Sequence, residues 1–111
     1  MTSELHVVSD CCPTGCGDVV VLLSARRTAV VFAYCQLCGC TWADPDSAQF
    51  ERGLQEVTPF WVRAPHGVDF PSGNEVAAAG LGHAILRTIP VHNWSTTLDE
   101  LNAEIARELA T

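Results

Sequence analysis

The sequence predicts an α+β fold, in which one β-hairpin is integrated into a small antiparallel sheet and a C-terminal amphipathic helix packs with it. Two apolar segments, 18–23 and 28–34, are separated by a short polar turn, as in a hairpin. Apolar residues recur at helical spacing near the C-terminus. The chain has 111 residues, of which 48% are hydrophobic, and this is enough for one core. We therefore expect a single domain over residues 1–111.

Two cysteine clusters flank the predicted hairpin. Cys12 and Cys16 enclose three residues, Cys35 and Cys38 enclose two, and eighteen residues separate the pairs. This spacing is typical of a structural zinc site. Four thiolates close a tetrahedron around Zn²⁺ and leave no position open for water or substrate. Zinc is the predicted metal, and iron stays an alternative because tetrahedral sulfur sites suit both ions.

Two further cysteines, Cys11 and Cys40, are left over by this assignment. Both extra residues are candidates for alternative ligands, with Cys11 in place of Cys12, for small buried apolar side chains, or for reactive thiols. Six cysteines can also form three disulfides, but residues 1–8 contain no secretory signal, and disulfides persist mainly in oxidising compartments. We therefore expect a metal site and a cytoplasmic protein.

The segment between the clusters is the predicted hairpin, with its turn at 24–27. Residues 19–23 are apolar at every position rather than at alternate positions, which indicates that both faces of this strand are covered. The hairpin should then lie in the core, and its two ends should bring the cysteine clusters together.

The Cys35-Gln36-Leu37-Cys38-Gly39 segment, together with the first cluster, resembles a zinc ribbon or rubredoxin-like knuckle pair over roughly residues 11–42. The resemblance implies a hairpin stabilised by metal, with residues 43–111 as the α+β remainder of the domain. Ribbons occur in transcription factors, ribosomal proteins, enzymes and adaptors, so the resemblance does not specify a function.

Beyond the second cluster, the pattern predicts a helix over 44–54, which begins at Asp44 with Pro45 in its first turn. A strand over 57–64, a loop over 65–73, a helix over 74–79 capped by Asn74, and a strand over 83–91 should follow.

The last predicted element is an amphipathic helix. Thr97 and Glu100 form a candidate capping box at its start. Its apolar stripe consists of Leu98, Leu101, Ile105 and Leu109. Glu100, Glu104 and Glu108 should point outward from this stripe.

The composition is strongly acidic. Thirteen Asp and Glu residues outnumber six Lys and Arg residues, for a formal net charge of −7. Such a surface repels phosphate backbones and favours encounter with basic partners. No apolar stretch is long enough to span a membrane.

The sequence contains no motif of a zinc deaminase, a metalloprotease, a serine hydrolase or a phosphate loop. We therefore predict a non-catalytic zinc-binding protein that binds a basic protein partner, either as an immunity or antitoxin-type inhibitor of a basic toxin or as an adaptor. The candidate partner-binding residues are acidic or aromatic: Asp44, Asp46, Glu51, Phe70, Trp94, Glu100, Glu104 and Glu108.

Two alternatives stay open. In the first, the protein is a nucleic-acid-associated ribbon in which Arg26 and Arg27 contact phosphate. In the second, it is a thiol-dependent enzyme that uses Cys11 or Cys40 with one of the four histidines.

Overall fold

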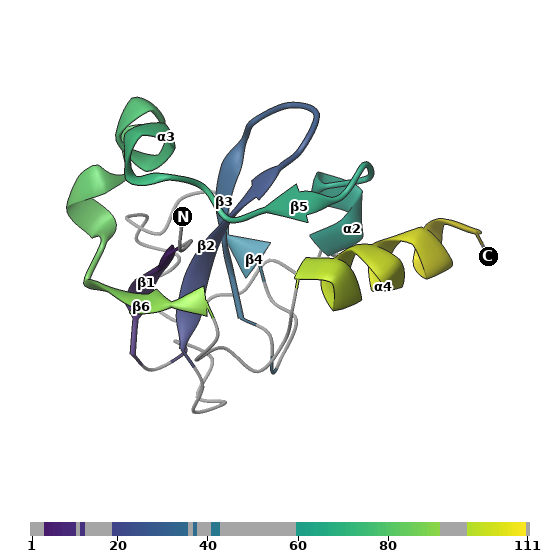
Figure 1. The fold of residues 1–111 in the computed structure, drawn as a ribbon, viewed down its shortest axis with the longest axis horizontal. Helices are drawn as coiled ribbons and strands as arrows, with labels where there is room; N and C mark the ends of the chain where they lie inside the picture. The colour runs from purple at the N-terminus through teal and green to yellow at the C-terminus, as the bar shows by residue number, and fades with distance from the viewer. Residues whose placement is uncertain are drawn as a thin grey trace.

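The computed structural model describes residues 4–10, 12, 19–35, 37, 41–42, 60–91 and 98–110. These residues form an α+β fold with a six-stranded antiparallel sheet and a C-terminal helix (Figure 1), which confirms the predicted class. The strands are β1 (Glu4–Ser9), β2 (Val20–Ala25), β3 (Val31–Tyr34), β4 (Thr41–Trp42), β5 (Val68–Asp69) and β6 (Arg87–Pro90). The helices are α2 (Phe60–Arg63), α3 (Gly73–Ala78), the short 3₁₀ helix η1 (Gly82–Ala84) and α4 (Leu98–Ala110).

Strand β2 is the centre of the sheet, whose order is β4-β3-β2-β1-β6. β1 pairs with β2 at Val20 and Val21, and β5 pairs with β2 at Ser24 and Ala25. The predicted hairpin is confirmed as β2 and β3, which pair antiparallel from Val21 to Ser24.

The hairpin turn begins two residues later than predicted. Ser24 was expected in the turn, but it is buried in β2, and its hydroxyl donates a hydrogen bond to the main-chain oxygen of Asp69 at 3.2 Å. Because that bond satisfies the hydroxyl, a polar residue can continue the strand. The turn is then completed by Ala29, which adopts a left-handed φ of 58°.

Side chains along a strand alternate between the two faces of the sheet. Buried residues lie on both of these faces and form two core clusters. Every residue of β2 is buried, as its uniformly apolar sequence predicts. One core cluster, which we call the helix face, consists of Leu5, Val7, Val21, Leu23, Ala25, Phe32, Tyr34, Ala64, Val68, Leu101 and Ile105. The other, which we call the cysteine face, consists of Cys12, Val20, Leu22, Val31, Ala33, Cys35, Trp42, Val76 and Leu81.

Several predicted elements differ in the structure. The strand expected over 57–64 is wrong for residues 60–63, which form the helical turn α2 and contact α4. Residue 59 is a proline, which suits the start of a helix better than a sheet. The loop expected over 65–73 contains β5, and the strand expected over 83–91 is confined to β6. β1 was not predicted, and the helix expected over 44–54 lies outside the described residues.

The N-cap of helix α3 is Ser72, two residues before the predicted Asn74. The Ser72 hydroxyl accepts a hydrogen bond from the Glu75 backbone N–H at 3.2 Å, and the Ser72 N–H donates to Glu75 Oε1 at 3.1 Å. These two bonds form a capping box, which satisfies backbone donors at the start of the helix.

Helix α4 has 13 residues and confirms the predicted C-terminal helix. Leu101 and Ile105 are buried in the helix face, and Leu98 is half-buried against it. Leu109 continues the same stripe but is 50% exposed. The expected capping residue Thr97 lies outside the described residues. None of the helices in the described ranges is long and apolar enough to cross a membrane.

Candidate functional site

Two of the four predicted metal ligands, Cys12 and Cys35, lie within the described residues. Both are buried, with 1% and 0% of their surface exposed, and both belong to the cysteine face. Cys12 follows β1 and Cys35 follows β3, so the order of strands brings these two distant parts of the chain into one cluster.

The other two predicted ligands, Cys16 and Cys38, lie outside the described residues, as do Cys11 and Cys40. Within the described residues, no set of three His, Cys, Asp or Glu side chains is grouped as a metal site. The four-cysteine metal site therefore stays a prediction, of which the structure describes one half.

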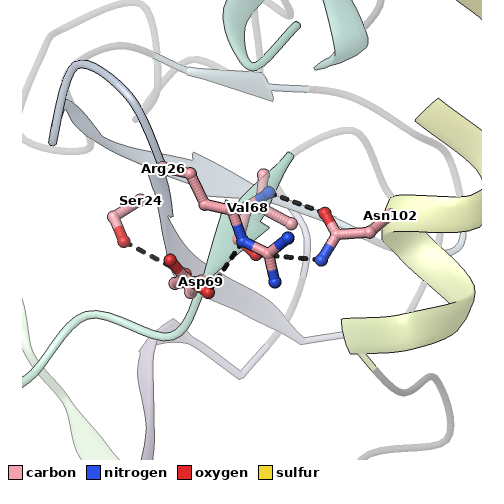
Figure 2. Close-up of polar contacts among 5 residues, drawn as sticks. All are labelled: Ser24, Arg26, Val68, Asp69 and Asn102. Atoms are coloured by element: carbon pink, nitrogen blue, oxygen red, sulfur yellow. Dashed lines mark hydrogen bonds and ion pairs between the residues drawn. The ribbon is translucent and has the colours of Figure 1, made fainter. Parts of the chain in front are cut away.

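Helix α4 is attached to the sheet by an asparagine that pairs with strand β5 (Figure 2). The Val68 N–H donates to Asn102 Oδ1 at 2.7 Å, and Asn102 Nδ2 donates to the Val68 carbonyl oxygen at 3.2 Å. The amide group thus bonds to the edge of β5 as a neighbouring strand would. Gly67 makes room for it, since a Cβ at this residue would lie 2.7 Å from Asn102 Oδ1, and its φ is +104°.

The C-terminal half of α4 continues beyond its buried contacts. All residues from 106 to 110 are exposed, and Figure 1 shows the helix extending away from the strands. The predicted partner-binding residues Glu100 and Glu108 are exposed, and Glu104 is half-buried. With Asp99, the helix carries four carboxylates and one arginine, Arg107, so its surface is acidic.

The remaining predicted partner-binding residues do not all lie within the described ranges. Phe70 is half-buried, packs against the helix face and lines one cleft with Leu98, the first residue of α4. Asp44, Asp46, Glu51 and Trp94 lie outside the described residues. Of the predicted partner-binding residues, the structure therefore places Glu100, Glu104 and Glu108 on α4 and Phe70 near the start of that helix.

The two arginines at the hairpin tip make side-chain contacts of their own. Arg26 Nε donates to Asp69 Oδ1 at 3.1 Å (Figure 2), and Arg27 Nη1 lies 3.4 Å from His66 Nε2. The carboxylate of Asp69 offsets the charge of Arg26. This pairing weakens the positive field that a phosphate backbone would need.

Some residues of this region were not identified from the sequence. Asp69 and Asn102 belong to no motif, and their partners lie 43 and 34 residues away along the chain. Gly67 was the one local signal, since a glycine often marks a position with positive φ.

A scan against protein-family models and searches of the curated proteins and of the solved structures found no match to this chain. Its function is therefore inferred from its own residues and their geometry.

Proposed function

We propose that this protein is a non-catalytic binding module, stabilised by a structural metal ion, that recognises a basic protein partner through helix α4. The observation that supports this most directly is the course of α4. The helix carries four carboxylates and one arginine and is held to the core at Leu101, Asn102 and Ile105. Its last residues, 106–110, continue into solvent with Glu108 and an exposed leucine.

The metal part of the proposal depends on the cysteines. Thiols are the ligands that zinc prefers in structural sites, and Cys12 and Cys35 come from the two predicted ligand pairs. Their burial in one cluster is what a shared ion would require. The resemblance to a zinc ribbon supports the same assignment. An ion with four thiolate ligands has no open position, so its role would be to stabilise the hairpin base.

The partner part of the proposal depends on charge and shape. An acidic surface accelerates the encounter with a basic protein and disfavours like-charged partners. The half-exposed Leu109 adds an apolar contact beside Glu108. This combination suits an immunity or antitoxin-type inhibitor of a basic toxin, or an adaptor subunit. The ion pair between Arg26 and Asp69 makes the nucleic-acid hypothesis the weaker one.

The test compares two variants that lose the same charge. Glu100→Gln/Glu108→Gln changes exposed residues of α4, and Glu4→Gln/Asp10→Asn changes exposed residues near the two ends of β1. A partner captured from an extract of the source cells is identified, purified and titrated by calorimetry. We expect a basic protein whose dissociation constant rises about tenfold with the α4 variant, rises with salt, and stays unchanged with the β1 variant.

Two outcomes would contradict the proposal. One is that no basic protein binds the purified chain at low salt. The other is that both variants bind the partner as tightly as the original protein does. Circular dichroism of the α4 variant is the control for helix content, and glutamine is chosen because its helix propensity is close to that of glutamate.

A further inference from the structure

A cleft of about 370 Å³ opens beside the start of α4. Its lining includes the apolar side chains of Phe70 and Leu98 and the charged side chains of Arg26, Asp69 and Glu75. This size falls at the lower end of the range typical of ligand sites, about 300–1,000 Å³. The lining comes from the end of β2, from β5, from α3 and from α4, so only the folded chain assembles it.

Among the described lining residues there are two carboxylates, and each is held in place by a hydrogen bond to one of its oxygens. Asp69 Oδ1 accepts from Arg26 Nε at 3.1 Å, while Ser24 Oγ bonds to the Asp69 main chain (Figure 2). Glu75 Oε1 accepts from the Ser72 N–H within the capping box. Asp69 Oδ2 and Glu75 Oε2 accept no hydrogen bond from the described residues. Each carboxylate is therefore held in position by one oxygen, and its second oxygen can accept a hydrogen bond from a ligand.

We propose that this cleft binds an arginine or lysine side chain of the basic partner, an inference that rests on the proposed function. The aliphatic stem would pack on Phe70 and Leu98, and the cationic end would lie between Asp69 and Glu75. The ring of Phe70 also favours a cation at its face. Because Leu98 begins α4, a partner seated on the acidic helix reaches the cleft without leaving the surface.

An anionic ligand fits the cleft less well. Among the described lining residues, Arg26 is the one cation, and Asp69 already accepts from the Nε of that guanidinium. A phosphate or carboxylate would face two carboxylates, so the net field of the lining favours a positive charge.

The test uses a single side chain as the probe. N-acetyl-L-arginine methylamide is titrated into ¹⁵N-labelled protein, and its neutral isostere N-acetyl-L-citrulline methylamide is the control at matched ionic strength. We expect a dissociation constant on the order of 1–10 mM, with amide shifts concentrated at Ala25, Asp69 and Phe70. The citrulline probe should bind at least fivefold more weakly. Equal binding of both probes, no binding, or preferential binding of inorganic phosphate would overturn the proposal.

A matched pair of variants locates the site. Asp69→Asn and Asp10→Asn each remove one carboxylate from a half-exposed arginine ion pair, and only Asp69 lines the cleft. We expect Asp69→Asn to weaken arginine binding about fivefold and Asp10→Asn to leave it unchanged. Glu75→Gln retains a residue that suits the capping box and should also weaken binding. Equal affinities for Asp69→Asn and Asp10→Asn would overturn the proposal.

The proposed function and the cleft can fail separately. If Glu100→Gln/Glu108→Gln loses the partner while Asp69→Asn binds it with full affinity, the function stands and the cleft proposal is overturned. If the arginine probe binds as described but no basic protein does, the cleft is supported as a cation site and the proposed function is overturned.

Discussion

The two faces of the sheet are buried by different means. On the helix face, α4 and the residue after α2 contribute apolar side chains, Leu101, Ile105 and Ala64. On the cysteine face, the described residues outside the sheet that join the cluster are Val76 of the six-residue α3, Leu81 that follows it, and Cys12 and Cys35, while the edge strand β4 adds Trp42. In the described residues, the helix face is therefore stabilised by apolar burial and by the Asn102–Val68 hydrogen bonds, whereas the cysteine face includes half of a predicted metal site. The two faces should therefore respond differently to metal removal.

The largest expected effect is on the cysteine face. Cys35→Ser should lower the free energy of unfolding by about 3 kcal/mol or more, because structural metal sites contribute directly to folding. A chelator should destabilise the original protein by a similar amount. Denaturant unfolding with and without chelator measures both, and elemental analysis should find one zinc or iron ion per chain. Leu37→Ser, at a neighbouring residue that is 64% exposed, is the control.

The measurement with chelator shows whether Cys35→Ser destabilises the protein by removing a metal ligand or only by burying a hydroxyl. If the purified chain holds no metal and the chelator changes nothing, the predicted site is wrong. Cys38→Ser should be as damaging as Cys35→Ser, and Cys40→Ser should be milder. Equal loss from all three would mean that the ligands are wrongly assigned.

The next largest effect is expected for a substitution on the helix face. Leu101→Ala should cost about 3 kcal/mol because it leaves a cavity under α4, and the cost should be the same with and without chelator. Leu109→Ala, on the same stripe but half-exposed, should cost less than about 0.5 kcal/mol. Similar losses from both variants would show that the exposed end of α4 is covered in solution.

The smallest effect has the opposite sign. His6 is 5% exposed, and its Nδ1 has no hydrogen-bond partner among the described residues. Its neighbours Leu5 and Val7 belong to the helix face, so the His6 side chain points to the cysteine face. His6→Leu should raise the free energy of unfolding by about 1 kcal/mol, since a buried polar atom without a bond is costly. His66→Leu, at an exposed residue, should be close to neutral. Lower stability of His6→Leu would indicate that the imidazole makes a bond the native fold needs.

Elements with a strong local pattern were predictable. The hairpin of β2 and β3 follows from a continuous apolar run on each side of a polar turn, and α4 follows from leucines at helical spacing. The short elements were not. β5 has two residues and α2 has four, too few for any period to appear in the sequence. The end of β2 was misplaced because the partner of the Ser24 hydroxyl lies 45 residues away.

By itself, the sequence determined the α+β class, the buried hairpin, the C-terminal helix and the acidic charge, because these depend on composition and on the spacing of near neighbours. The tertiary structure alone decided that Cys12 and Cys35 share a buried cluster, that Asn102 pairs with Val68, and that Asp69 and Glu75 line one cleft. Such groupings depend on how strands pair and how helices pack, and no local pattern specifies which distant residues meet.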